Sequence, residues 1–446
     1  MTANIENNIK NNPPNRTKNN FAKLLIILET IFLIMFLLLT WFGFYSFGGL
    51  CFAGFWFCLA GLVRFHTMTK SFSYTIIVFG CVTTSMYFPD FYLHIGSIKT
   101  TAFIIPILQV IMFGMGTQLS LRDFQGILQN PYGVFVGMIC QFSIMPTIGF
   151  LIATGFGFEP EIAAGIILVG SVPCGIASNV MNFIAKSNMA LAVSLTAVST
   201  LVAPILTPFL VKFFAGQLVE VLYVKMMVEI THLVILPIIA GLMFRTIVTS
   251  TIHLYSVLLH LTVFVLLITV FNILFTVCGH YLYKDIFNHT LSQCGIFLLL
   301  PVLGAFLLRT FIIYYPDWFD RILSLVSMIG LLLTIVIINA AGRDYLLKIG
   351  FLLIFACLLH NLLGFFFGYW LARFVGLDER SCRTIAIEVG MQNGGLASGL
   401  ALQMGKVATV GLAPAIFGPL MNITGSSLAT WWRNRPVEKI YNNTNN

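Results

Sequence analysis

The sequence predicts an all-α protein that crosses a membrane many times, and two observations lead to this prediction. Of the 446 residues, 58% are hydrophobic and only 9% are charged, and the mean hydropathy is +0.94. An average soluble domain carries about 25% charged residues, so this chain lacks the polar side chains needed to cover a water-facing surface. Apolar stretches of about 20 residues, the length that spans hydrocarbon, also recur along nearly the whole chain. Because no water is available inside lipid, these stretches are predicted to be helices, whose backbone satisfies its own hydrogen bonds.

Fourteen stretches are long enough to span a bilayer. They are residues 22–42, 46–63, 71–89, 101–119, 131–155, 162–185, 189–211, 226–245, 254–278, 292–313, 322–342, 349–372, 384–404 and 408–432. The first is too long for the apolar region of a signal peptide and is predicted to remain as a helix. The Asn-rich segment before it, residues 1–20, is predicted to be a disordered tail.

The distribution of basic residues predicts the orientation of the chain. An even number of spans places both termini on one side, and with the first tail in the cytoplasm 17 of the 24 Lys and Arg residues also lie there. Such an excess is typical of cytoplasmic loops. We therefore expect a multi-pass protein of the cell (inner) membrane with both termini cytoplasmic. The net charge of +8 is dispersed between apolar runs, so the partner is the lipid bilayer and not a nucleic acid.

Two of the predicted spans are interrupted by polar and helix-breaking residues. One contains the segment from Ser171 to Asn179, in which Pro173 removes a backbone donor and clashes with the preceding turn. The other runs from Glu388 to Gly395 and includes three glycines, which leave it free to unwind. Non-helical backbone at membrane depth survives only where it lines a cavity or is buried in protein. A matched pair of interrupted spans is typical of transporters built from inverted repeats.

Glu388 is the sharpest candidate for a functional side chain, because an acid inside an apolar run is costly and usually functional. A hard cation such as Na⁺ prefers oxygen ligands, and the two interrupted segments supply carboxylate, amide and hydroxyl oxygens together with freed backbone carbonyls. The side chains concerned are Glu388, Asn179, Gln392 and Ser178, with Thr196 and Gln141 on neighbouring spans. The alternative is a polar cluster that only holds helices together.

Enzyme signatures are lacking in the sequence. It contains neither a P-loop nor an HExxH sequence, and its acids do not cluster inside a span. The nine cysteines have no CxxC spacing, so neither zinc nor a disulfide framework is indicated. A membrane-embedded enzyme or receptor would need clustered catalytic residues or a sizeable extramembrane domain, and we therefore predict that the chain is not an enzyme.

The interrupted segments also carry a resemblance to the bile acid:sodium symporter family, over about residues 71–432 with a gap. Its most specific pieces are Ala177-Ser-Asn-Val-Met181, Asn188-Met-Ala-Leu191, Ser199-Thr200 and Glu388-Val-Gly-Met-Gln-Asn393. The resemblance implies ten core helices in two inverted five-helix repeats, divided into panel and core domains, with two broken helices that cross. We expect the repeats at residues 71–212 and 226–432. The four extra spans are two N-terminal helices at 21–64 and a pair inserted near 254–313, and residues 433–446 form a cytoplasmic tail.

The resemblance further implies symport of an organic anion with Na⁺, bound at two sites. One site uses Ser178, Asn179, Thr196 and Glu388; the other uses Gln141, Glu388, Gln392 and the backbone carbonyls of Val389 and Met391. Asn393 would face the substrate. The chain departs from the family pattern at Ala192, where relatives often carry serine, and at Ile176, where they can carry a small polar residue.

The substrate stays open between bile acid-like anions and smaller carboxylates. A carrier of the same fold that is proton-coupled or uncoupled remains the alternative, with Glu388 as the titrating group. The set of oxygen ligands around Glu388 favours sodium, because a proton carrier does not need it.

Overall fold

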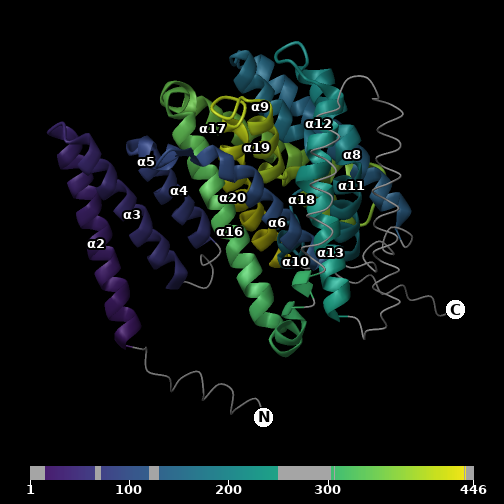
Figure 1. Ribbon diagram of the computed structural model, residues 1–446, viewed down its shortest axis with the longest axis horizontal. Coiled ribbons are helices and arrows are strands. Elements are labelled where there is room, and N and C mark those ends of the chain that lie inside the picture. Colours follow the sequence, from purple (N-terminus) through teal and green to yellow (C-terminus); the bar gives the residue numbers. More distant parts are fainter. Residues whose placement is uncertain are drawn as a thin grey trace. The chain divides into compact units, whose positions relative to one another are not determined.

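The computed structural model describes residues 16–65, 72–119, 130–249, 303–305, 307–435 and 437. These residues are almost entirely helical (Figure 1). Eight helices among them are long and apolar enough to cross a membrane, in agreement with the predicted all-α membrane fold. The predicted span 254–278, residues 292–302 of the predicted span 292–313, and the tail up to residue 15 lie outside the described residues.

The described residues form two compact units. Unit 1 contains residues up to Thr100 and the segment Ile335–Arg343, and its elements are α2 (Arg16–Trp41), α3 (Tyr45–Phe65), α4 (Ser73–Tyr87), α5 (Pro89–Leu93), β1 (His94–Ile95) and β2 (Ile98–Lys99). The two short strands pair antiparallel, with His94 opposite Lys99. α2 begins within the stretch predicted as a disordered tail, because no Pro or Gly lies between Pro14 and Gly43 and the helix can extend upstream from the apolar run.

Glycines allow α3, which contains the predicted span 46–63, to pack closely against α2. α2 and α3, purple in Figure 1, run side by side. A methyl group placed on Gly48 would lie 3.0 Å from Thr40 of α2, and one on Gly54 would lie 3.0 Å from Phe32. Between these contacts the rings of Phe36 and Phe52 stack with centroids 4.5 Å apart. Small residues at a helix interface let two membrane helices approach closely.

Unit 2 contains the remaining helices, and it holds all of the predicted site residues. Its elements are η2 (Thr100–Phe103), which begins at the boundary residue, α6 (Ile104–Gln118), α8 (Pro131–Gly155), α9 (Pro160–Ser171), α10 (Ala177–Ile184), α11 (Met189–Ala215), α12 (Tyr223–Ile230), η3 (Thr231–Ile235), α13 (Leu236–Thr249), α16 (Pro316–Ala341, which ends in unit 1), α17 (Arg343–Phe374), α18 (Glu379–Gly390), α19 (Gly394–Gln403) and α20 (Leu412–Arg433). The π-helical turn η3 interrupts one continuous apolar stretch, Tyr223–Val248.

Two predicted spans are broken at the predicted places. Residues 162–185 form α9 and α10, separated by a non-helical segment at Val172–Ile176 that contains Pro173. Residues 384–404 form α18 and α19, separated at Met391–Asn393. α9, α18 and α19 are buried over most of their length, so the freed backbone lies within protein.

Helices α6 and α13 meet at two glycines that face each other's backbone. A methyl group on Gly116 would lie 2.1 Å from the carbonyl oxygen of Ile238, and one on Gly241 would lie 2.2 Å from that of Phe113. Because the obstructing atoms belong to the backbone, no change of rotamer can relieve the overlap. These helices can approach this closely only with glycine at both positions.

We expect Gly241→Ala to destabilise the protein by about 1–3 kcal/mol, since the two helices must separate to admit the methyl group. The matched control is Gly418→Ala in α20, where an added methyl group meets no atom within 4 Å. Thermal unfolding of the purified protein measures both variants. An unfolding midpoint of Gly241→Ala equal to that of the control would contradict the packing described here.

Candidate functional site at the two helix breaks

The two non-helical segments, Val172–Ile176 and Met391–Asn393, lie against each other and pair through their backbones. We call this place the crossing. Cys174 and Gln392 form an antiparallel bridge. The amide of Gly175 donates to the carbonyl oxygen of Met391 at 3.0 Å. A methyl group on Gly175 would lie 3.0 Å from the carbonyl oxygen of Gln392, so a glycine permits this approach. The pairing satisfies backbone groups that the helix breaks leave without helical partners.

Asn393 links the first non-helical segment to the start of α19. Its backbone amide donates to the carbonyl oxygen of Pro173 at 2.9 Å. Its side-chain oxygen accepts from the amide of Leu396 at 3.0 Å and so caps the N-terminus of α19. Asn393 is buried. The residue predicted to face the substrate is therefore also the cap that starts the second half-helix.

Four half-helix ends converge where the segments cross. α9 ends at Ser171 and α18 ends at Gly390, and both present carbonyls that have no partner within their own helix and carry partial negative charge. α10 begins at Ala177 and α19 begins at Gly394, and both present amides with partial positive charge. The crossing can therefore attract a cation at one pair of ends and an anion at the other.

Glu388 lies in the last turn of α18, and its side chain is buried. Its Oε1 accepts from Nδ2 of Asn182 at 2.8 Å, and its Oε2 accepts from the hydroxyl of Thr196 at 3.0 Å. None of the ion pairs formed by the described residues involves Glu388. The carboxylate also stands at the negative end of its own helix, which disfavours an anion there. A buried carboxylate with only neutral donors is balanced either by a bound cation or by a proton.

The other members of the first predicted sodium site lie around Glu388. Ser178 is buried in the first turn of α10, and its hydroxyl donates to the carbonyl oxygen of Gly175 at 2.7 Å while also facing the Glu388 carboxylate. The side-chain oxygen of Asn179 is buried and accepts no hydrogen bond from the described residues. With Thr196 these residues form a cluster of oxygens around one negative charge.

Ala192, which replaces a serine of the family pattern, offers a backbone oxygen. It is fully buried in α11, and its carbonyl accepts from the hydroxyl of Thr196 at 3.1 Å. The same Thr196 hydroxyl contacts Glu388. The oxygen that lies near the first site at this position is thus a carbonyl of the main chain.

The second predicted set is centred on two amides. Nε2 of Gln141 donates to the carbonyl oxygen of Val172 at 3.1 Å and to Oε1 of Gln392 at 2.8 Å. Nε2 of Gln392 in turn donates to the carbonyl oxygen of Val389. Oε1 of Gln141 is buried and accepts no hydrogen bond from any described residue. The amide oxygen of Gln141 is thus available to a cation.

The structure brings the two sets together along α18. The carboxylate of Glu388 accepts from Thr196 of the first set and from Asn182, and it joins the second set through the backbone of its neighbour Val389. The carbonyl of Met391, predicted as a ligand of the second site, accepts from Gly175 at the crossing. Eight of the nine predicted residues are buried, and Asn179 is half-buried.

Sequence reasoning missed two asparagines that hold this site. Asn182 donates to Glu388, and its own oxygen accepts from the hydroxyl of Ser187 at 2.6 Å. It follows Ser178 by four residues and so lies on the same helix face, a spacing that could have identified it. Asn361 of α17 donates to the carbonyl oxygen of Gly390 at 2.7 Å, where α18 ends. A lone amide in an apolar span was the available signal.

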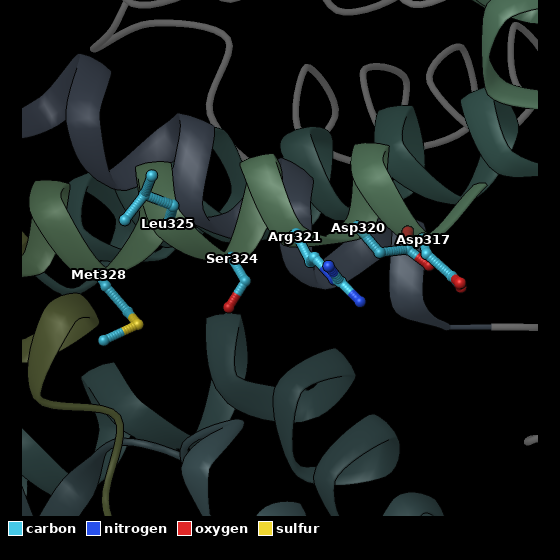
Figure 2. A pocket seen from close by; sticks show the side chains of 6 residues that line it. All are labelled: Asp317, Asp320, Arg321, Ser324, Leu325 and Met328. Carbon is cyan, nitrogen blue, oxygen red and sulfur yellow. The ribbon is translucent and has the colours of Figure 1, made fainter. Parts of the chain in front are cut away.

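A separate hollow of about 610 Å³ lies along α16. Figure 2 shows its lining, which comes from this one helix: Asp317, Asp320, Arg321, Ser324, Leu325 and Met328. Asp320 also pairs with Arg245 of α13 at 3.4 Å. The hollow contains none of the predicted site residues, and its two carboxylates do not suit an anionic ligand.

Comparison of the sequence with known proteins identifies one family. The model of the sodium bile acid symporter family matches residues 105–285. An uncharacterized sodium-dependent transporter of Bacillus subtilis, YocS, is 32% identical over 379 residues, which cover 84% of this chain and 94% of that protein. The chain belongs to the sodium bile acid symporter family.

Two further relatives indicate how widely the family is distributed. A probable chloroplastic sodium/metabolite cotransporter of rice, BASS2, is 30% identical over 329 residues, which cover 73% of this chain and 62% of that protein. The human ileal sodium/bile acid cotransporter is 28% identical over 308 residues, or 68% of this chain and 70% of that protein. These relatives are sodium-dependent transporters, so the predicted family, the multi-pass membrane class and the prediction of a transporter and not an enzyme are confirmed.

We expect Asn182→Leu to lower stability in sodium-free buffer by about 1–3 kcal/mol, because it leaves a buried carboxylate oxygen of Glu388 without its amide donor. The matched control is Asn434→Leu, at an exposed position just after α20. Thermal unfolding measures both. If the two variants unfold at the same temperature, the hydrogen bond to Glu388 does not hold the site.

Proposed function

We propose that this protein is a symporter that couples the inward movement of Na⁺ to that of an organic anion by alternating access. Its family is sodium-dependent, and its relatives are cotransporters of bile acids or metabolites. The observation that carries the proposal is the buried carboxylate of Glu388, which has neutral hydrogen-bond donors and no ion pair among the described residues. A bound cation would supply the missing charge.

The first sodium site would use Ser178, Asn179, Thr196 and Glu388. The free side-chain oxygen of Asn179 supports this assignment, since a buried amide oxygen without a donor is costly unless a cation satisfies it. Hydroxyl, amide and carboxylate oxygens match the preference of hard cations. One carboxylate gives the bound ion the charge balance that a monovalent cation needs.

The second sodium site would use Gln141, Gln392, the shared Glu388 and the carbonyls of Val389 and Met391. The free oxygen of Gln141 supports it. The carbonyl of Val389 now accepts from Gln392, and that of Met391 accepts from Gly175. An incoming ion would compete for the same oxygens, so binding would draw the two crossing segments into a different arrangement.

The anion would bind beside the ions, near Asn393. The N-termini of α10 and α19 point partial positive charge to the crossing, which suits a carboxylate. With the ions bound, the summed charge of Glu388, the ions and the anion would be zero or one unit. Without the ions, the negative charge of Glu388 would repel the anion. This difference in charge provides the coupling.

Alternating access would follow from movement of a core domain against a panel domain. We place the inverted repeats at residues 71–212 and 226–432, with both termini in the cytoplasm of the cell (inner) membrane. The helix pair expected near 254–313 lies mostly outside the described residues. An inserted pair would preserve the direction of the helices that follow it and so would be compatible with the inverted arrangement.

A proton-coupled or uncoupled carrier is the second candidate. Glu388 alone could carry a proton, and burial of a single acid is all that such a mechanism requires. The unpartnered oxygens of Asn179 and Gln141 favour sodium, because a proton on Glu388 would leave both without a partner.

We expect NaCl, compared with choline chloride at equal ionic strength, to raise the unfolding temperature of the wild-type protein. Ligand binding stabilises the folded state by about 2.7 kcal/mol when the ligand is at a hundred times its dissociation constant. Glu388→Gln should abolish the effect, whereas Glu229→Gln, which changes a partly buried acid of α12, should retain it. Stability that follows pH and ignores the cation would favour the proton carrier.

Uptake into proteoliposomes tests the number of coupled ions. With two Na⁺ and a monovalent anion, one positive charge enters per cycle, and an inside-negative potential of about 100 mV contributes about 2.3 kcal/mol, or about fifty-fold accumulation. We expect a potential imposed by a potassium ionophore to raise sodium-driven uptake of a substrate chosen from a panel of carboxylates. Uptake that does not respond to the potential would rule out this stoichiometry.

A further inference from the structure

A second cavity in unit 2 lies between α17, α18 and α20, and it contains none of the nine residues assigned to sodium or anion. Its volume is about 570 Å³. Leu362 and Phe366 of α17 and Leu428 of α20 line the apolar part of the cavity. Trp431 and Arg435 line the part that also carries positive charge. We call this cavity the lateral groove.

The lateral groove changes character along its length. Leu362, Phe366 and Trp370 follow one another at intervals of four residues on one face of α17, so this apolar wall extends over about 12 Å. At the far end Tyr369 stacks near Trp432, with ring centroids 6.0 Å apart. Tryptophan and tyrosine are typical of the boundary between hydrocarbon and headgroups.

Positive charge lies at this aromatic end. Arg383 is 5% exposed and is held by Glu379 at 2.8 Å, so these two charges largely compensate each other. The guanidinium of Arg435 lies 4.4 Å above the ring of Trp431 and belongs to no ion pair among the described residues. Residues 373–383 and 433–435 together contain five arginines and two acids, so this end of the three helices is positive.

We propose that the lateral groove binds a phospholipid with an anionic headgroup. One acyl chain would lie along the apolar wall of α17 and α20, and the phosphate would bind the free edge of the Arg435 guanidinium. In the proposed topology this end faces the cytoplasm, where the leaflet is rich in anionic lipids. A small anion such as free phosphate would leave the apolar wall unused, and a zwitterionic lipid would gain less from Arg435. The proposal does not depend on sodium coupling.

The test uses the purified full-length protein in micelles that contain equal amounts of phosphatidylglycerol and phosphatidylcholine with the same acyl chains. Native mass spectrometry counts the lipids that remain bound. We expect retention of phosphatidylglycerol in preference to phosphatidylcholine. Arg435→Gln should weaken retention of phosphatidylglycerol about fivefold, the effect of about one basic residue near a membrane surface. Arg433→Gln is the matched control, since it removes the same charge from the same exposed helix end but does not line the groove.

Three outcomes would overturn the proposal. Equal retention of the two lipids would exclude headgroup selectivity, and equal losses in Arg433→Gln and Arg435→Gln would indicate a diffuse charge effect. Displacement of the lipid by millimolar inorganic phosphate would assign the site to a free anion. An unchanged unfolding temperature in both variants establishes that any lost lipid reflects the groove and not the fold.

Discussion

The arrangement around the helix breaks depends on the burial of one carboxylate that forms no ion pair with any described residue. Glu388 lies in the last turn of a half-helix, where the partial charge is negative, and its hydrogen bonds come from Asn182 and Thr196, which are neutral. Burial of an unpaired charge costs several kcal/mol. In the proposed function a bound Na⁺ would compensate this cost. The amide oxygens of Asn179 and Gln141 accept no hydrogen bond from the described residues, and under the proposed function the same ions would coordinate them.

The helix breaks follow from this constraint. A continuous helix would use every carbonyl in its own hydrogen bonds, whereas the breaks at Pro173 and at Met391–Asn393 expose backbone groups at the depth where the charge lies. In the state described here these groups hold each other through the bridge between Cys174 and Gln392 and through Asn361. Sodium would exchange these internal hydrogen bonds for coordination. Under the proposed function the crossing would therefore have two competing sets of partners, which could stabilise two different states.

Much of this arrangement was predictable from the sequence. The long apolar spans, the two breaks and the isolated acid at Glu388 each carry a strong local signal, and the structure has helices and breaks at those places. The sequence signal for Asn182 and Asn361 was weaker, because their roles depend on hydrogen bonds to residues of α18 that are far from them in the sequence. The start of α2 at Arg16 was missed since helix extension into a polar segment depends on the stability of the helix that follows.

Direct measurement of sodium bound to the purified protein tests the account most closely. Equilibrium dialysis against radioactive sodium, with choline as the balancing cation, counts bound ions without need of a known substrate. The account predicts saturable binding of two Na⁺ per chain, with loss of both in Glu388→Gln because the carboxylate is shared. No saturable binding in the wild-type protein, or binding that survives unchanged in Glu388→Gln, would contradict it.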